Sequence, residues 1–417
     1  MSTAITHIKT ERQLVPALRF PGNMGVWQEM MIGNFANVKS GYTFSREYQG
    51  LKNEKWLYLK VADIGIKSNI KYLKTAINTI SEETLRNIKA KPYRKGCTIF
   101  PRVGMALLNN NKRLLYEDSL VDDNVLALDI FDIEKCDDEF IFYWFLTKHL
   151  SDFCNNGQIP VISASRVKAF HVPVPEKIEQ QKIASFLSAV DEKTQLLTKK
   201  KALLEQYKKG VMQQLFSGQL RFKDENRNPY PDWVDRKLGE VLKEFVEKTT
   251  KSNQHPILSS TKKDVYLQSE YFTRDIASKD NTGYKVLKRN QLVFSPQNLW
   301  LGNININVKY DIGIVSPSYK VFDFKNDLAK VLYFKDFLLS NRMMYEYAQA
   351  SEQGASVVRR NLDMPSFKAI KIQLPSIEEQ QKIATYLARI DTKIESVNNQ
   401  ITQTQTFKKG LLQQMFV

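Results

Sequence analysis

The chain contains little of the chemistry on which enzymes and covalently cross-linked proteins depend. Only three cysteines and four histidines occur among its 417 residues. Cys97, Cys136 and Cys154 are far apart and form no Cys-x-x-Cys pair, so neither a disulfide framework nor a zinc site is predicted. We find no run of 18 or more apolar residues and no leader or lipidation motif, which predicts a soluble, cytoplasmic protein.

Motifs for nucleotide and metal chemistry are missing as well. No G-x4-G-K-[ST] loop occurs, and the nearest string to the Asn/Asp-Pro-Pro-aromatic loop of an adenine methyltransferase, at 228–231, lacks the second proline. The nearest carboxylate pair, Asp232 and Asp235, is crowded beside Trp233, whereas a metal-dependent nuclease draws its carboxylates from separate strands. These absences favour a binding protein over an enzyme.

Basic residues are in clear excess. Lysine and arginine number 61 against 45 acidic residues, which gives a net charge of +16 and a pI of about 9.4. An excess of this size favours a polyanionic partner, because neutralised phosphates release counterions. With 42% apolar and 11% aromatic residues the chain can build folded cores, and its length predicts two to three domains. Nucleic acid is therefore the first candidate partner.

One long segment occurs twice, without gaps, at an offset of 200 residues. Residues 172–216 align with residues 372–416, and about 16 of the 45 pairs are identical. The identical residues include Gln-Gln-Lys-Ile-Ala, at 180–184 and at 380–384. The chain is therefore predicted to consist of two half-molecules, each a variable block followed by the repeated arm.

The repeated arm has the pattern of a coiled-coil helix. Residues 176–209 contain neither glycine nor proline, Pro175 and Pro375 precede the two copies, and Ser376 with Glu379 predicts a capping box. Apolar residues recur every seven positions over about four heptads, the period of a helix that packs lengthwise on another helix. We expect the two arms to pair with each other. The predicted interhelix residues are Ile183, Val190, Leu197, Leu204 and Val211 in the first arm and Ile383, Leu387, Ile390, Ile394, Val397, Ile401 and Leu411 in the second.

The two variable blocks open alike and have mixed secondary structure. Each begins with a tryptophan six residues before a glycine, Trp27 to Gly33 and Trp233 to Gly239. Short β-like runs alternate with turn residues, so we predict an α+β fold. Two globular domains with mixed sheets would be joined by two long antiparallel coiled-coil helices in a pseudo-twofold arrangement. The expected boundaries are 1–171 and 219–371 for the globular domains, and 172–218 and 372–417 for the arms.

Particular segments of the blocks are expected to form strands and helices. The runs 56–61 and 319–322 are predicted strands. Aromatic-rich segments at 139–153 and 328–350 are each predicted to form a helix that closes its block.

Basic and amide side chains crowd into loops of both blocks. Arginine and lysine contact phosphates and pair with guanine, whereas asparagine and glutamine pair with adenine. Such loops predict base reading, although solvated turns of a basic protein have the same composition. The predicted DNA contacts are Arg94, Lys95, Arg102, Lys112, Arg113 and Arg166 in the first block and Lys288, Arg289, Gln297, Asn298, Tyr319, Arg359 and Arg360 in the second.

At the arms the chain resembles the specificity subunits of type I restriction-modification systems. The resemblance is carried by Pro-x3-Glu-Gln-Gln-Lys-Ile-Ala followed by Leu187, Asp191 and Lys193, and by the same residues 200 positions later. The tryptophan-to-glycine openings and the 315–319 run of the second block agree with it. It implies a non-catalytic subunit whose two domains read a bipartite double-stranded DNA site, with the paired helices acting as a ruler.

The resemblance also implies the partners. Two methyltransferase subunits would dock on the arms, restriction/translocase subunits would join them, and one copy of this chain would serve each complex. S-adenosylmethionine, Mg and ATP would be used by those partners and no cofactor by this chain, in a bacterial or archaeal cytoplasm close to the nucleoid. Two departures stand out: Met1–Leu18 is expected to have no counterpart in the repeat, and the second arm is poorer in charge around 398–403.

Antiparallel arms would hold the two blocks at opposite ends of a stiff spacer. Two surfaces held in this way suit a duplex whose two read segments lie about one turn, roughly 34 to 36 Å, apart. The alternatives are arms that pack only on their own blocks, a stand-alone DNA methyltransferase or nuclease, and a coiled-coil adaptor with no nucleic-acid role.

Overall fold

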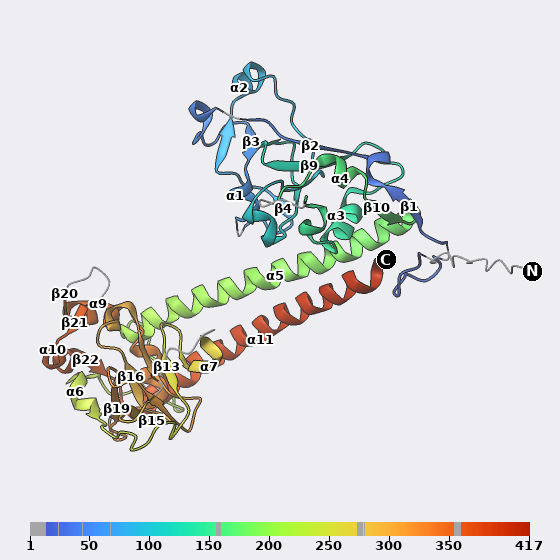
Figure 1. The fold of residues 1–417 in the computed structure, drawn as a ribbon. Helices are drawn as coiled ribbons and strands as arrows, with labels where there is room; N and C mark the ends of the chain where they lie inside the picture. Colours follow the sequence, from blue (N-terminus) through green and yellow to red (C-terminus); the bar gives the residue numbers. More distant parts are fainter. Residues whose placement is uncertain are drawn as a thin grey trace, which may run out of the picture. The chain divides into compact units, whose positions relative to one another are not determined.

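The computed structural model places the chain in two compact units. It describes residues 14–23, 25–43, 45–66, 68–155, 160–272, 278, 280–353 and 360–417. Unit 1 holds the described residues up to Thr198 together with Asn399–Val417, and unit 2 holds Lys199–Asn398. Each unit therefore combines one variable block with segments of both arms (Figure 1).

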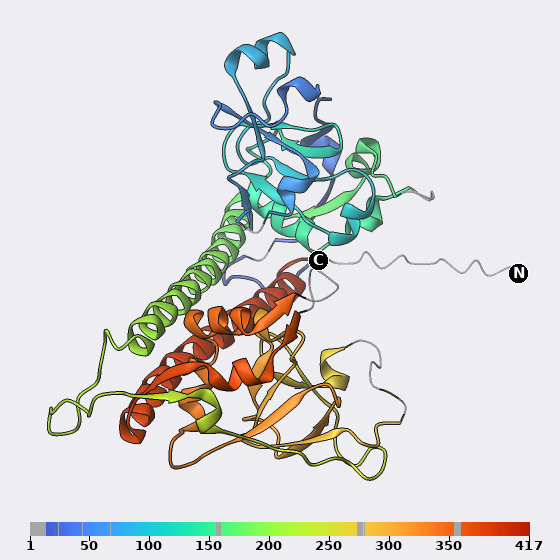
Figure 2. The same cartoon turned by 90° about the vertical axis from the view of Figure 1, so that its left-hand side faces the viewer.

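Two long helices form the arms. Helix α5 (Lys177–Phe216) has 40 residues and helix α11 (Ile377–Met415) has 39, so each is about 60 Å long. Both are unbroken (Figures 1 and 2) and continue past Gly210 and Gly410, beyond the 34-residue span expected from the sequence. The glycines are tolerated because the residues after them, such as Leu215, are buried in the core.

The helices run antiparallel within each unit. In unit 1, Ile183 and Leu187 near the start of α5 share a core with Leu411 near the end of α11. In unit 2, Leu215 near the end of α5 shares a core with Leu387 near the start of α11. Of the predicted interhelix residues, Ile183, Val190, Val211, Ile383, Leu387, Ile390, Val397 and Leu411 are buried, and Leu197, Leu204, Ile394 and Ile401 are half-buried.

Unit 1 is built on a five-stranded mixed sheet. Its strand order is β2-β9-β6-β7-β4, in which only β4 and β7 pair in parallel, and a three-stranded sheet of order β5-β3-β8 lies alongside in the same block. The strands are β1 (Gln28–Met31), β2 (Ala36–Ser40), β3 (Trp56–Leu59), β4 (Tyr72–Leu73), β5 (Asn78–Ile80), β6 (Thr98–Pro101), β7 (Arg113–Leu115), β8 (Leu120–Val121), β9 (Val125–Ile130) and β10 (His171–Val174). The short helices are α1 (Val61–Ile64), α2 (Glu82–Asn87), α3 (Asp138–Leu146) and α4 (Ala164–Lys168), with 3-10 turns η1 (Ile32–Asn34), η2 (Arg46–Tyr48), η3 (Met105–Asn109) and η4 (Leu150–Phe153).

Unit 2 is built on a four-stranded antiparallel sheet of order β12-β19-β16-β17. The strands are β11 (Val234–Lys237), β12 (Leu242–Glu244), β13 (Leu258–Ser260), β14 (Val265–Leu267), β15 (Lys285–Lys288), β16 (Leu292–Phe294), β17 (Ile304–Ile306), β18 (Ile312–Val315), β19 (Lys320–Phe324), β20 (Ser351–Gln353), β21 (Arg360–Leu362) and β22 (Lys371–Leu374). The helices are α6 (Leu238–Val241), α7 (Gln268–Tyr271), α8 (Val331–Phe337), α9 (Asn341–Gln349) and α10 (Met364–Ala369), with the 3-10 turn η5 (Leu299–Leu301).

The two sheets are equivalent strand by strand. The order β2-β9-β6-β7 corresponds to β12-β19-β16-β17, and the antiparallel pair β1-β10 corresponds to β11-β22. Strand β4 extends the sheet of unit 1 only, since the described part of unit 2 has no strand beyond β17 in its sheet. The α+β prediction, with two globular blocks and two long helices, is confirmed.

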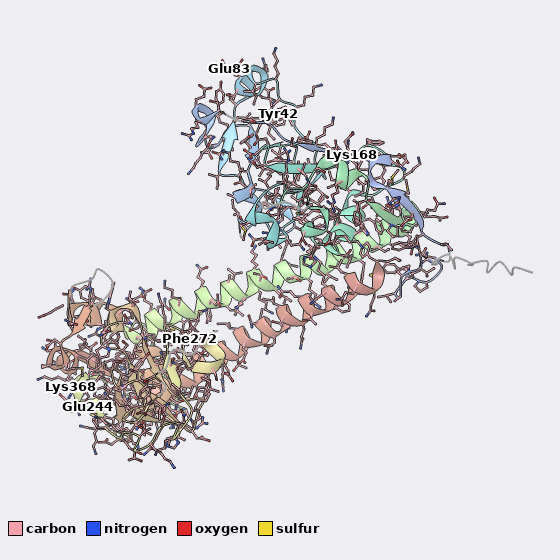
Figure 3. The ribbon with its side chains drawn as sticks, in the orientation of Figure 1. Tyr42, Glu83, Lys168, Glu244, Phe272 and Lys368 are labelled. Carbon is pink, nitrogen blue, oxygen red and sulfur yellow. The ribbon has the colours of Figure 1, made fainter. Side chains whose placement is uncertain are left out.

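Gly33 and Gly239, the two repeated glycines, each lie against the short helix that precedes the arm of their block. A Cβ on Gly33 would lie 3.3 Å from the Lys168 Cβ and carbonyl oxygen, and one on Gly239 would lie 2.8 Å from the Lys368 Cβ. Lys168 in α4 and Lys368 in α10 are labelled in Figure 3. The tryptophan-to-glycine spacing therefore places a residue without a side chain where the block meets the segment that leads into its arm.

The two predicted closing helices are each interrupted. The segment 139–153 forms α3 and the 3-10 turn η4, and the segment 328–350 forms α8 and α9. In unit 2 the break occurs because the Ser340 side chain accepts a hydrogen bond from the Met343 amide and starts a new helix. In unit 1 His149 and Asp152 form a capping box at the start of η4. The prediction of one continuous helix in each block is wrong for this reason.

No helix in the described part of the chain is long and apolar enough to cross a membrane.

Candidate nucleic-acid interface

A buried glutamine anchors the start of each arm to its block. The Gln180 amide donates to the carbonyls of Lys135 and Pro175, and its oxygen accepts from the Asp137 amide at 2.8 Å. These bonds tie the loop that leads into α3 to the first turn of α5. Sequence reasoning had no role for this glutamine, and its repetition in both arms was the only available signal.

Gln380 makes the same three bonds in unit 2. It donates to the carbonyls of Leu328 and Pro375 and accepts from the Lys330 amide at 2.9 Å. Both glutamines are fully buried. Each recognition block is thus fixed to its own arm by one side chain of the duplicated motif.

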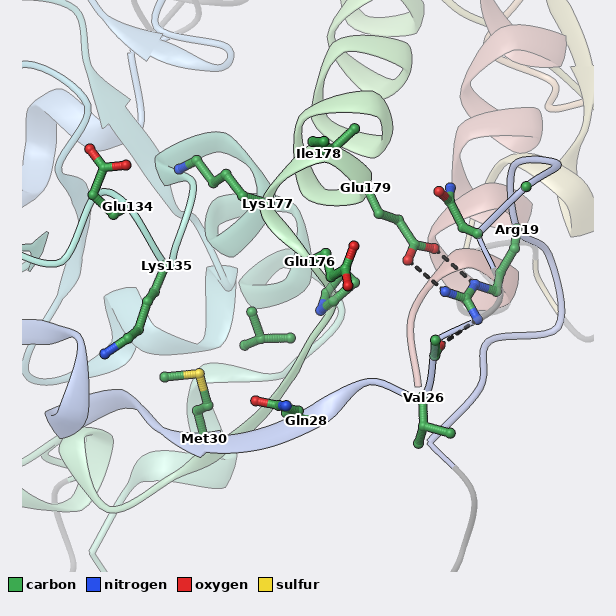
Figure 4. Close-up of a pocket in the computed structure, with 15 residues that line it drawn as sticks. Arg19, Val26, Gln28, Met30, Glu134, Lys135, Glu176, Lys177, Ile178 and Glu179 are labelled. Carbon is green, nitrogen blue, oxygen red and sulfur yellow. Dashed lines mark hydrogen bonds and ion pairs between the residues drawn. The ribbon is translucent and has the colours of Figure 1, made fainter.

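An arginine-glutamate pair also repeats at the start of each arm. Arg19 reaches Glu179 at 2.6 and 2.9 Å beside a cavity of about 520 Å³ (Figure 4), and Arg221 reaches Glu379 at 2.9 Å. The hydrogen bond to Glu179 raises the pKa of Arg19. The Ser376 side chain accepts from the Glu379 amide as predicted, but the Glu379 carboxylate turns to Arg221 and so does not complete the capping box.

The Arg19 contact also corrects an expectation about the N-terminal stretch. The Leu18 amide donates to the Gln414 carbonyl at 2.9 Å, and the Leu220 amide donates to the Gln214 carbonyl at 3.1 Å. Leu18-Arg19-Phe20 therefore corresponds to Leu220-Arg221-Phe222. Leu18 has a counterpart in the repeat, and the prediction that it had none is wrong.

Equivalent ion pairs join the two helices inside each unit. Lys408 of α11 contacts Asp191 of α5 at 2.6 Å in unit 1, and Lys208 of α5 contacts Asp391 of α11 at 2.8 Å in unit 2. Each pair lies close to the buried apolar residues between the arms and fixes the register of α5 and α11 within its unit. The aspartates, and the lysines of the Lys-Lys-Gly sequence, occupy equivalent positions in the two arm copies.

The basic turns that precede β6 and β16 are held by acidic side chains. Arg94 makes a bidentate pair with Asp138 at 2.7 and 2.8 Å, which raises its pKa, and also contacts Asp129. Arg289 donates to Asp311 at 2.8 Å and to two backbone carbonyls. Guanidinium groups engaged in this way support the fold, and we leave both out of the proposed interface.

The neighbouring lysines, Lys95 and Lys288, differ in accessibility. Lys95 is exposed, with its ammonium 5.8 Å from the centre of the Tyr116 ring. Lys288 is half-buried and pairs with Glu247 at 2.6 Å. Both remain predicted DNA contacts.

Lys112 is enclosed by the protein, whereas the neighbouring Arg113 is half-buried. The Lys112 side chain is only 1% exposed, and its ammonium donates to the Asn110 side chain at 2.8 Å and the Lys148 carbonyl at 2.7 Å. Arg113 donates to the carbonyls of Asn69 and Lys112. An enclosed ammonium cannot reach a phosphate, so the structure gives Lys112 a structural role. The half-buried Arg113 remains a predicted DNA contact.

The buried amine predicts a pH-dependent stability of unit 1. Burial lowers the pKa of Lys112 to about 8, below the value of about 10.4 in an unfolded chain. Between these values the unfolded state holds a proton that the folded state has released, so stability rises with pH. From pH 7.5 to 10, the free energy of unfolding should increase by about 2 kcal/mol more in the wild type than in Lys112→Met. Urea unfolding across this range measures it, and parallel pH profiles of the two proteins would contradict it.

In unit 1 the loop after β6 joins the segment that precedes α4. Val103 bridges to Val161, the Ile162 amide donates to the Arg102 carbonyl at 2.9 Å, and the Gly104 amide donates to the Pro160 carbonyl at 3.0 Å. Arg102 is half-buried. Arg166, in the first turns of α4, is exposed.

In unit 2 the corresponding loop, after β16, joins the β20-β21 hairpin. The Arg360 amide donates to the Gln297 carbonyl at 3.4 Å, and the Arg360 guanidinium lies 4.4 Å from the centre of the Trp300 ring. Gln297 is exposed and Asn298 is half-buried. Arg359 lies outside the described residues. Thus the loop after the central strand and the segment before the arm, predicted separately, come together in both units.

Tyr319 immediately precedes strand β19. Its hydroxyl donates to the Ser260 carbonyl at 3.2 Å, and burial raises its pKa. The phenol is half-buried, so only part of its ring is available to a ligand.

The junctions carry binding groups without a metal site beside them. Among the described residues, no group of three or more histidine, cysteine, aspartate or glutamate side chains could hold a metal ion. Guanidinium, amide and apolar side chains on loops can contact phosphates and base edges.

Comparison with known proteins places the chain in a family. Residues 24–206 and again residues 230–405 match the type I restriction modification DNA specificity domain. The chain belongs to this family. The two matches, one per half, agree with the duplication seen in the sequence.

Individual relatives are more distant. The chain is 27% identical over 158 residues to the type I restriction enzyme MjaVIII specificity subunit of Methanocaldococcus jannaschii, covering 36% of this chain and 34% of that protein. It is 25% identical over 193 residues to the MjaIX specificity subunit of the same organism, covering 41% and 44%. The chain thus spans less than half the length of these two curated relatives. The S subunit of a type I restriction-modification system from M. genitalium has a similar fold, with a TM-score of 0.55 at 15% identity over 97% of this chain and 99% of that one.

Proposed function

We propose that the chain reads a bipartite double-stranded DNA site, one half with each recognition domain. The observation that carries this proposal is the repeated junction, where the loop after the central strand joins the segment before the arm. In unit 1 it presents Arg102 and Arg166, and in unit 2 Gln297, Asn298 and Arg360. The net charge of +16 supports a phosphate-rich ligand.

The helices α5 and α11 act in this proposal as the ruler between the two half-sites. Their length of about 60 Å, their antiparallel course within each unit and the ion pairs at Asp191 and Asp391 support a stiff spacer. The recognition domains are proposed to span residues 1–171 and 219–371, and the arms residues 172–218 and 372–417.

The remaining functions belong to partners. We propose that two methyltransferase subunits dock on the arms of a single copy of this chain, and that restriction/translocase subunits join them. S-adenosylmethionine, Mg and ATP would then be bound by those subunits. This chain would determine which DNA sequence the complex binds.

Selection of DNA by the assembled complex tests the proposal. The chain, reconstituted with its methyltransferase subunits, is incubated with random-sequence duplexes and the bound fraction is sequenced. Recovery of one motif in two parts with a fixed gap is expected. A single continuous motif, or DNA modification by the purified chain alone, would overturn the proposal.

A matched insertion in both arms tests the ruler. One heptad added to α5 between 193 and 206, with one added opposite it in α11, preserves the apolar seam and lengthens the pair by about 10 Å. The gap between the half-sites should then widen by about three base pairs, since DNA rises about 3.4 Å per base pair. An unchanged gap would exclude the ruler without affecting the recognition domains.

Arg360 and Arg289 make a matched pair for mapping the interface of unit 2. Arg360→Ala should weaken binding of the selected motif by about 1 to 3 kcal/mol and relax one base position, because this guanidinium lies at the junction. Arg289→Ala, whose guanidinium is engaged by Asp311, should leave the selected sequence unchanged. Fluorescence anisotropy with single-base variants of the motif measures both. A change of motif with Arg289→Ala and none with Arg360→Ala would place the interface elsewhere.

A further inference from the structure

Met105 and Leu108 form an exposed apolar edge on the 3-10 turn η3 of unit 1. Met105 is 73% exposed and Leu108 is 63% exposed, whereas Leu107 between them is 2% exposed. In a 3-10 helix, side chains three residues apart lie directly above one another. Met105 and Leu108 therefore share one face, and Leu107 fixes the opposite face in the core. No other large apolar side chain in the described part of the chain is as exposed as Met105.

The turn is held rigidly. The Leu107 amide donates to the Gly104 carbonyl at 3.1 Å, and the Asn110 amide closes the turn on the Leu107 carbonyl at 3.0 Å. The Asn110 side-chain oxygen also accepts from the Lys112 ammonium and from the Leu150 amide. A rigid apolar edge loses little conformational entropy when a ligand covers it.

The edge continues the proposed DNA interface. Met105 follows Gly104, whose φ of +77° turns the chain at the end of the loop that carries Arg102. The Gly104 amide is hydrogen-bonded to the Pro160 carbonyl, and Arg166 follows a few residues later on α4. The apolar edge is thus attached to the same junction as two cationic side chains, which favours a nucleic acid over a protein as the ligand.

The equivalent turn of unit 2 is chemically different. In η5, Leu299 is buried and the Trp300 ring lies against the Arg360 guanidinium. The unit 2 junction therefore offers cationic and amide groups, whereas the unit 1 junction offers two exposed apolar side chains beside its arginines. The two domains are equipped to read different base-pair edges.

We propose that Met105 and Leu108 contact the C5-methyl group of thymine in the major groove, so that the first recognition domain selects an A·T pair. This inference rests on the proposed function. Among the unmodified base pairs, the thymine methyl is the apolar group displayed on the major-groove edge, and small apolar side-chain surfaces recognise it. Arg102 and Arg166 beside the edge would hold the phosphates or a guanine.

Removal of single methyl groups from the DNA tests the inference. The half-site read by unit 1 is first identified by cross-linking of the complex to the selected DNA through a photoreactive group attached to Arg102→Cys. Each thymine in that half-site is then replaced in turn by deoxyuridine, which lacks only the C5-methyl. The complete complex should lose affinity about fourfold for at least one replacement, since one buried methyl group contributes about this much.

The variant proteins assign the effect to the two side chains. Met105→Ala with Leu108→Ala should bind the thymine and uracil duplexes equally, whereas Ile133→Ala, which removes an apolar side chain that is 56% exposed elsewhere in unit 1, should keep the difference. Both residues are exposed, so the thermal unfolding of the variants should match the wild type.

Several outcomes would overturn the inference. They are equal binding of every uracil duplex by the wild type, a half-site without an A·T pair, and a double variant that still distinguishes thymine from uracil. Loss of methyltransferase assembly in the double variant, with thymine discrimination unchanged, would assign the edge to a protein partner instead. Failure of the proposed function is seen separately and earlier, because the wild-type complex would then select no bipartite motif.

Discussion

Gln380→Leu is expected to destabilise unit 2 by about 4 kcal/mol, because three backbone groups lose the hydrogen bonds of one buried side chain at once. The Lys330 amide and the carbonyls of Leu328 and Pro375 all bond to this one side chain, which has no exposure to solvent. Leucine has nearly the same volume and leaves no space for water to replace the amide. Urea unfolding, followed through tryptophan fluorescence and hydrogen exchange of unit 2, measures the loss.

The adjacent residue is the matched control. Gln381 is exposed and bonds only to Thr385 in the next turn of the same helix, so Gln381→Leu should change stability by less than about 0.5 kcal/mol. Gln180→Leu and Gln181→Leu should show the same contrast in unit 1, since Gln180 makes the equivalent bonds. Equal effects of the two substitutions in either pair would show that the buried amide does not anchor the block.

Gly41→Ala should destabilise unit 1 by an amount on the order of 4 kcal/mol, through a clash that the backbone cannot relieve. A Cβ on Gly41 would lie 1.7 Å from the carbonyl oxygen of Val121 and 2.3 Å from its carbonyl carbon. The adjacent Tyr42 amide donates to that same carbonyl at 2.9 Å, so moving the strands apart would break this bond. Thermal unfolding of the two proteins gives the difference.

Gly65→Ala is the control for this substitution. A Cβ at Gly65 would meet only the Ala62 carbonyl oxygen, at an ordinary contact distance of 3.5 Å, so its unfolding free energy should stay within about 0.5 kcal/mol of the wild type. A Gly41→Ala protein as stable as Gly65→Ala would mean that the approach of the chain to Val121 is looser than described.

The features that the sequence predicted correctly are periodic or repeated. The spacing of Ile183, Val190 and Val211 predicted a long packed helix, because a seven-residue period has one structural cause. The strands β3 and β19 were found because their β-branched and aromatic residues alternate with turn residues. The duplicated arms and the tryptophan-to-glycine pairs at the start of each block were sufficient to predict the family.

The features that were missed depend on partners far away in the chain. Arg94 looked like a free cation in a basic turn, but Asp138, 44 residues later, engages its guanidinium. Lys112 looked exposed among asparagines, yet tertiary packing encloses it. Conversely, Met105 and Leu108 would be taken for core residues on composition alone, and only the fold places them on the surface.

The division of each arm between the two units has a consequence for folding during synthesis. The core of unit 1 contains Leu411, Met415 and Phe416, which are separated from the rest of that unit by about 200 residues of unit 2. A ribosome adding about 5 to 20 residues per second needs roughly 10 to 40 s to cross that interval. For that time Ile183 and Leu187 in the nascent chain lack the apolar residues of the C-terminal segment that complete their core. Unit 1 should therefore depend on chaperones more than unit 2, whose residues are contiguous.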